Sequence, residues 1–171
     1  MADKKRTRLR DFQVALAERL QQATRQPERR SRLAVSVGDR RLLCSLDEVA
    51  EVAPVPAVTR VAKTQPWFLG VANVRGTLYA VTDLSRWLGG VATRQDAEAR
   101  LVILGGDLAR HRTALVVGRV LGLRQLEGME PVSGGLESWA TGAWRGADGV
   151  LWTELNVHQL LGEPGFLQVA A

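Results

Sequence analysis

Hydrophobic residues recur with a helical period near the start of the chain and with a strand period after residue 32. The early apolar positions, three or four apart, are Leu9, Phe12, Leu16, Leu20 and Ala23. This spacing predicts an amphipathic helix of about four turns, which ends at Gln26-Pro27 because proline disfavours helix at the preceding residue. Its apolar stripe is expected either to pack on the following domain or to bind a partner or a membrane surface.

From residue 32 the apolar segments are short and separated by turn residues. The segments RLAVSVG and RLLCSL flank Gly38-Asp39, which predicts a hairpin. Pro54 and Pro56 place the following stretch at a sheet edge or in a loop. The segment TALVVGRVLGLRQL is expected to be one strand, with Gly118 and Gly122 as bulges or bends. Many short strands with few helices predict a mainly β fold.

Residues 66–89 form the most informative stretch. Two apolar strands flank a turn at Arg75-Gly76, and a short helix capped by Asp83 follows and ends at Gly89. The apolar residues of these strands, Leu78 included, are expected in the core. Arg75 sits at the turn tip, where no core would place it, so a guanidinium there indicates recognition of a partner. The alternative is an internal salt bridge that steadies the turn.

A second stretch repeats this design 73 residues later. Residues 76–89 and 149–162 align without a gap, and each begins with a turn glycine and closes with Leu-Gly. Both place an aromatic residue in the strand and a capping residue, Asp83 or Asn156, before the helix. The shared register indicates two similar subdomains, although two unrelated hairpin–helix units could also look alike.

The charge distribution separates the leader from the body. Residues 1–32 hold ten Lys/Arg and four Asp/Glu, a net +6, whereas residues 33–171 hold thirteen and fourteen, a net −1. A nucleic-acid-binding body usually carries its own basic patch, so the basic leader more simply indicates a solvated tail. The leader has no apolar core of a secretory signal, no apolar run approaches about 20 residues, and Cys44 is alone, so the cytoplasm is expected.

No catalytic, metal or cofactor site is predicted. His111 and His158 have no Cys, Asp or His at metal-ligand spacing, and no Gly-x-Ser-x-Gly elbow occurs. Ser133-Gly134-Gly135 is a turn signal without the Lys-Ser/Thr of a phosphate loop. We therefore expect a binding module and not an enzyme.

The residues of the 66–89 stretch resemble the signature of the CheW-like chemotaxis coupling domain. The matching positions are Gly70, Asn73, Val74, Arg75, Gly76, Val81, Asp83, Leu84 and Leu88-Gly89. The resemblance covers about residues 32–162, with a leader over 1–31 and a tail over 163–171. It implies two small SH3-like antiparallel β-barrel subdomains that are intertwined and share a core, with short helices. Many members have an acidic residue after the ALVV strand, where this chain has Gly118-Arg119.

The resemblance also implies a function. Such a protein is a non-catalytic cytoplasmic adaptor that joins the regulatory domain of a CheA-type histidine kinase to the tip of a chemoreceptor, and it meets the membrane only through receptors. Arg75 is then the first candidate contact, with Asn73, Gly70 and Gly76 shaping its strand and turn, and Phe68 is the aromatic residue expected at the interface. The sequence is most similar to adaptors of the type IV pilus (twitching) chemosensory systems.

Three other functions stay open at this stage. The chain could be an adaptor of flagellar chemotaxis, which would have the same partners by class. Small barrels with a basic leader can also bind single-stranded nucleic acid, although the body is acidic and carries one Tyr and three Phe for base stacking. An enzyme with dispersed residues would need a deep pocket and a strongly perturbed titratable group.

Overall fold

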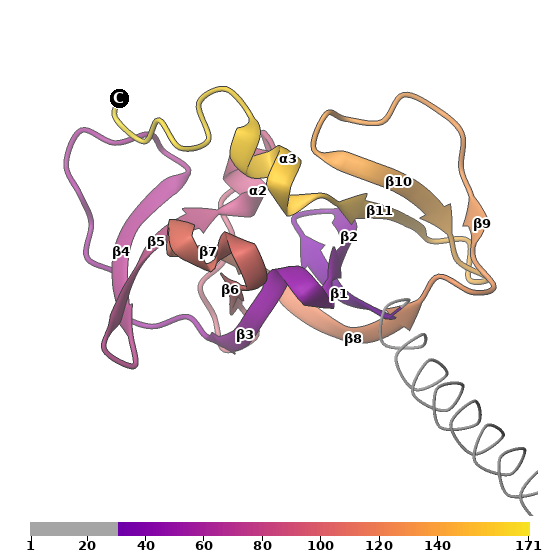
Figure 1. Cartoon of the computed structure of the whole chain (residues 1–171), viewed down its shortest axis with the longest axis horizontal. Coiled ribbons are helices and arrows are strands. Elements are labelled where there is room, and N and C mark those ends of the chain that lie inside the picture. The colour runs from indigo at the N-terminus through magenta and orange to yellow at the C-terminus, as the bar shows by residue number, and fades with distance from the viewer. Residues whose placement is uncertain (1–30) are drawn as a thin grey trace, which may run out of the picture.

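A computed structural model describes residues 31–171 and shows two β-sheet subdomains side by side (Figure 1). The helix predicted over residues 9–23 lies outside the described residues. The strands are β1 (Ser31–Val37), β2 (Arg40–Ser45), β3 (Val49–Pro54), β4 (Phe68–Val74), β5 (Thr77–Asp83), β6 (Arg100–Leu104), β7 (Thr113–Val117), β8 (Arg119–Gln125), β9 (Glu130–Pro131), β10 (Ala140–Arg145) and β11 (Leu151–Leu155). The helices are the short η1 (Leu46–Glu48) and η2 (Gly106–His111) and the α-helices α2 (Leu84–Trp87) and α3 (Val157–Gly162). The mainly β prediction is confirmed.

The two sheets have the same pairing pattern. The first subdomain has the strand order β3-β6-β7-β5-β4, and the second has β8-β1-β2-β11-β10 with β9 added at the edge. In each sheet a hairpin, β4–β5 or β10–β11, is followed directly by an α-helix. The resemblance of residues 76–89 to residues 149–162 is therefore a real structural repeat.

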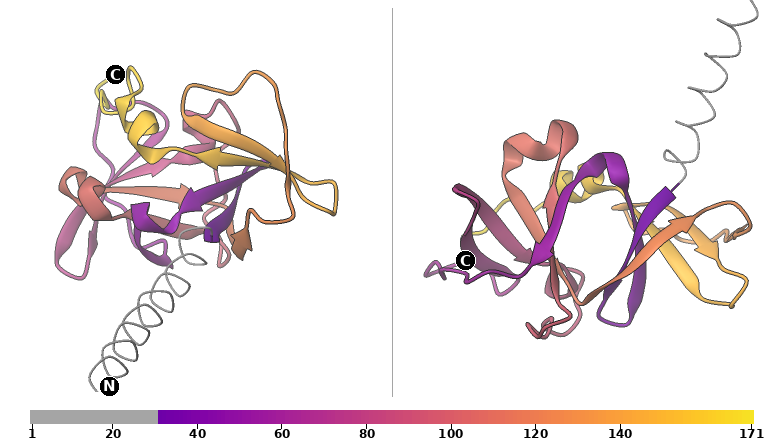
Figure 2. Two further views of the ribbon diagram at one scale, coloured as in Figure 1. Left: turned by 45° about the vertical axis from the view of Figure 1, so that its right-hand side comes forward. Right: turned by 90° about the horizontal axis from the view of Figure 1, so that it is seen from below.

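Chain order differs between the repeats. In the first subdomain the antiparallel pair β6–β7 follows the β4–β5 hairpin, whereas in the second the equivalent pair is the β1–β2 hairpin at the start of the described chain. Figure 2 shows this first hairpin beside β8 and β11, which follow the first subdomain in the sequence. The subdomains are intertwined because the chain forms the β1–β2 hairpin, builds the first subdomain, and then returns as β8 to complete the second.

Each sheet also contains one parallel pair, β5 with β7 or β11 with β2. The implied barrels were expected to be antiparallel. The paired strands are joined through intervening helices, loops and strands instead of a tight turn, and such a connection allows parallel pairing.

Gly118 and Gly122 have different roles from one another. The segment around them was predicted to be one strand. It forms two, because the chain leaves the first sheet after β7 and enters the second sheet as β8. At Gly118 the backbone N–H donates to Ser36 O at 2.8 Å, which holds the crossing. Gly122 has a φ of +94° and lies at a register shift opposite Ala34 and Val35, so the predicted bulge is confirmed there.

One hydrophobic core joins the subdomains. Its fully buried members include Leu84 and Leu115 from the first subdomain and Leu42, Leu155 and Leu160 from the second. Smaller clusters fill each sheet's other side, around Val81, Ile103 and Val116 or around Leu43 and Trp152. The shared core that the family resemblance implied is present, so neither half buries its apolar surface alone.

Candidate protein-interaction site

The turn between β4 and β5 carries an arginine in a backbone conformation that side chains rarely adopt. Val74 pairs with Thr77, which leaves Arg75 and Gly76 as the two turn residues, with φ values of +50° and +85°. Positive φ at both positions is typical of the type I′ turns that match strand twist, and glycine or asparagine usually fill them. An arginine there costs conformational energy, which favours a role for its side chain.

Neighbouring residues hold the turn in place. Asn73 Oδ1 accepts a hydrogen bond from Gly76 N at 2.8 Å. Arg75 Nη2 lies 2.9 Å from Glu51 Oε1 on β3, so the ion pair connects the β4–β5 turn to the opposite edge strand of the first sheet. The Arg75 side chain is nevertheless 80% exposed. The salt bridge that was the alternative explanation is present, yet it leaves most of the Arg75 side chain exposed to a partner.

Gly70 shapes the strand that leads to the turn. Its φ is +130°, and a Cβ there would lie 2.0 Å from Thr59 O. Thr59 and Val71 exchange backbone hydrogen bonds of 2.8 and 2.9 Å, so a second segment crosses β4 at this point. Only glycine permits this close approach.

Leu78 is a correction to the core prediction. It is 57% exposed, and it lies opposite Asn73 on the outer face of the hairpin. Tyr79 and Val81 point to the inner cluster, because successive side chains of a strand alternate. If Thr77, Tyr79 and Val81 are taken as the inward-facing residues of β5, alternation places Leu78 on the outer face. We call Glu51, Asn73, Arg75, Gly76 and Leu78 the tip surface.

Phe68 does not belong to the tip surface. It is only 9% exposed and packs edge to face on Trp67, with ring centroids 6.4 Å apart. Trp67 in turn stacks on Phe166 at 5.8 Å, and Trp87 meets Phe166 at 5.2 Å. Phe68 is therefore part of the packed interior. The expectation that it contacts a partner is not supported, because its side chain is buried against Trp67.

Asp83 is the predicted helix cap and has a second role. The residue is 1% exposed, and its carboxylate accepts hydrogen bonds from Ser85 N and Arg86 N at the start of α2. It also accepts from Thr93 N at 2.9 Å and from Thr93 Oγ1 at 2.7 Å. The residue therefore fixes the loop between α2 and β6 as well as the helix.

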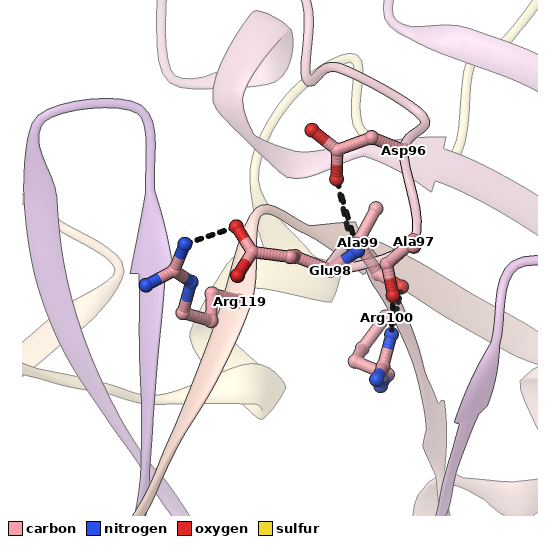
Figure 3. A network of polar contacts seen from close by, with 6 residues as sticks. All are labelled: Asp96, Ala97, Glu98, Ala99, Arg100 and Arg119. Carbon is pink, nitrogen blue, oxygen red and sulfur yellow. Dashed lines mark hydrogen bonds and ion pairs between the residues drawn. The ribbon is translucent and has the colours of Figure 1, made fainter.

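That loop reaches the second subdomain. Glu98 forms an ion pair with Arg119 at the start of β8, while Asp96 Oδ1 accepts from Glu98 N and Ala99 N and Arg100 Nη1 donates to Ala97 O (Figure 3). Backbone hydrogen bonds hold the pKa of Asp96 below its usual range. Arg119, the basic departure from the family pattern, thus has an acidic partner within the chain.

The titratable groups offer little for covalent or metal chemistry. Burial raises the pKa of the Cys44 thiol to about 12, with Glu48 adding to the shift, so the thiol is protonated at neutral pH. His158 Nε2 lies 3.4 Å from Asp107 Oδ1. Among residues 31–171 no group of three or more His, Cys, Asp or Glu is arranged to hold a metal ion. Over the same residues, no helix is long and apolar enough to cross a membrane.

Comparison with known proteins gives consistent results. The chain is 27% identical over 146 residues to Protein PilI of Pseudomonas aeruginosa strain PAO1, a match that covers 82% of this chain and 80% of PilI. The scaffolding protein TtCheW of Thermoanaerobacter tengcongensis has a similar crystal structure, with a TM-score of 0.68 and 19% identity over 80% of this chain and 90% of TtCheW. The sequence model of the CheW-like domain matches residues 31–164. The chain therefore belongs to the CheW-like domain family.

Proposed function

We propose that this CheW-like adaptor couples chemoreceptors to a CheA-type histidine kinase in the cytoplasm, without catalysis of its own, in a type IV pilus chemosensory system. The observation that carries the proposal is the tip surface. It presents an 80% exposed arginine on a strained turn beside an exposed leucine, which is the combination of charge and apolar contact that protein interfaces use. The similarity to PilI supports the pilus system over the flagellar one.

Arg75 would contact an acidic side chain or backbone carbonyls of a receptor helix or of the kinase regulatory domain. Its guanidinium has five N–H donors, and the pair with Glu51 uses Nη2. A charge-assisted hydrogen bond contributes about 1.5–3 kcal/mol when it forms at an interface. Leu78, opposite Asn73, would add apolar area next to it.

The test is assembly of purified adaptor with the receptor signalling tip and the kinase of the same system. Replacing Arg75 by Ala is expected to weaken coupling about tenfold or more, and Arg75→Glu is expected to weaken it further, because a like charge would face the partner's carboxylate. Stability should change by less than about 1 kcal/mol, since the pair with Glu51 is exposed.

Arg94 provides the matched control, because it is exposed on the loop after α2 and away from the tip. Arg94→Glu should assemble like the wild type. Normal assembly of both Arg75 variants would show that Arg75 is not a contact. Loss of the gene is expected to abolish twitching and to leave swimming unchanged, and the reverse phenotype would assign the chain to the flagellar system.

A further inference from the structure

The charged residues that line a small cavity on the first subdomain are all cationic. The cavity has a volume of about 230 Å³, and the residues around it are Arg60, Val61, Lys63, Thr64, Gln65, Pro66, Phe68, Leu69 and Arg86. The larger cavities of about 450 and 510 Å³ differ, because Asp39 and Glu137 line the first and Asp96 and Glu98 line the second. We propose that the small cavity, here called the cationic niche, binds a phosphate group.

Three cationic side chains, Arg60, Lys63 and Arg86, line the niche, and its lining residues include no carboxylate. Arg86 Nη1 donates to Pro66 O at 2.9 Å, which orients its guanidinium and leaves its other N–H groups for a ligand. Arg60 and Lys63 form no ion pair with any residue in the described range 31–171. An anion bound in the niche would form charge-assisted hydrogen bonds with these cations.

The niche is built on a fixed segment. Lys63 has a φ of +56°, which costs a non-glycine residue conformational energy and calls for local support. The C-terminal segment supplies that support: Gln65 N donates to Val169 O at 2.8 Å, and Ala171 N donates to Lys63 O at 3.0 Å. Thr64 Oγ1 also donates to Val61 O at 2.9 Å. A loop held in this way loses little entropy when a ligand binds.

The volume and the charge select the ligand class. A cavity of about 230 Å³ is smaller than the roughly 300–1,000 Å³ of sites for drug-sized ligands, so it suits a single compact group. A phosphate group carries about −1.5 to −2 charges at neutral pH and matches arginine with paired hydrogen bonds, whereas one carboxylate would leave two cations uncompensated. The lining also includes the apolar residues Leu69 and Pro66, which can contact the first carbon of a small phosphomonoester.

The experiment is an NMR titration of the ¹⁵N-labelled full chain at constant ionic strength. Inorganic phosphate is the first probe and glycerol 3-phosphate is the second. We expect saturable shifts confined to the amides of residues 60–65 and 86. The variants Lys63→Asn and Arg86→Ala should each weaken binding about tenfold, and asparagine tolerates the positive φ that the loop requires. The matched control Arg110→Ala removes an exposed arginine outside the niche and should bind like the wild type.

Tighter binding of glycerol 3-phosphate would identify an organic phosphomonoester as the ligand, and equal affinity would identify free phosphate. Shifts that do not saturate, or that are as large at Arg75 and Arg110 as in the niche, would overturn the proposal. It would also be overturned if both niche variants, with wild-type amide dispersion, bound phosphate as tightly as the parent chain. None of these results depends on coupling to receptor or kinase.

Discussion

The two hairpin–helix units share a scaffold and differ at the tips and in the hydrogen bonds that their helix caps form. In the first unit, the two-residue turn Arg75-Gly76 presents a guanidinium that reaches Glu51. In the second, residues 146–150 form a wider turn, in which Gly146 N donates to Val150 O and Asp148 Oδ1 accepts from Val150 N. The turn glycine, the inward aromatic residue and the helix cap are common to both. Most of the common residues build the fold, so Arg75, which is particular to the first unit, is the first candidate for partner recognition.

The exposed leucine after each turn belongs to the common part. Leu78 is 57% exposed, and its counterpart Leu151 is 48% exposed. Exposure of one leucine is common on a protein surface, but the same position exposed twice shows that both hairpins leave this position uncovered. Arg75 is what makes the first of these faces chemically distinct.

The largest predicted effects come from the core that the units share. Leu84 and Val157 are equivalent first residues of α2 and α3, and both are buried in the junction. We expect Leu84→Ala to lower the free energy of unfolding by about 3 kcal/mol and Val157→Ala by about 2 kcal/mol, in urea denaturation. Each variant should keep a single transition. Two separate transitions would show that the halves are independent domains and would break the comparison.

A substitution at Gly70 tests the close approach of the Thr59 segment to β4. An alanine Cβ would clash with Thr59 O at 2.0 Å, and its φ of +130° would be strained as well. We expect Gly70→Ala to cost about 3 kcal/mol of stability by chemical denaturation. Gly134 is the control, because a Cβ there meets nothing within 4 Å, so Gly134→Ala should stay within about 0.5 kcal/mol. Equal costs for the two variants would contradict the close approach.

The caps offer a test of intermediate size. Asp83 accepts four hydrogen bonds in a buried position, whereas Asn156 caps α3 through one bond to Gln159 N at 3.0 Å. Asp83→Ala is therefore expected to lower stability by about 2–3 kcal/mol, and Asn156→Ala by about 1 kcal/mol. Thermal unfolding of both variants measures the difference. If Asn156→Ala proved the more damaging, the added role of Asp83 in holding Thr93 would be wrong.

The smallest effect on stability is expected at the tip itself. Glycine adopts the positive φ at position 75 without strain, which stabilises the folded state. It also raises the conformational entropy of the unfolded chain, so the two effects on the free energy of unfolding nearly cancel. Arg75→Gly should therefore stay within about 1 kcal/mol of the wild type in denaturant. Coupling to partners should still fall about tenfold, because the guanidinium is gone. A stable variant with undiminished coupling would remove Arg75 from the proposed contact.

Local features were largely predictable from sequence, because they depend on neighbouring residues. The β1–β2 hairpin follows from Gly38-Asp39, the bulge from Gly122, and the start of α2 from Asp83. The proposed contact at Arg75 also came from local chemistry. Phe68 and Leu78 were assigned to the wrong sides, because alternation gives two faces and does not say which of them another part of the chain will cover.

The sequence by itself determined the family, the mainly β class, the repeat and the arginine at the turn. Tertiary structure alone decided that the first hairpin completes the second subdomain, that Phe166 covers the aromatic cluster beside Phe68, and that Glu51 reaches Arg75. The physical reason is distance along the chain. Hydrogen-bonding and turn preferences act over a few residues, whereas burial is settled by whichever distant segment removes an apolar face from water.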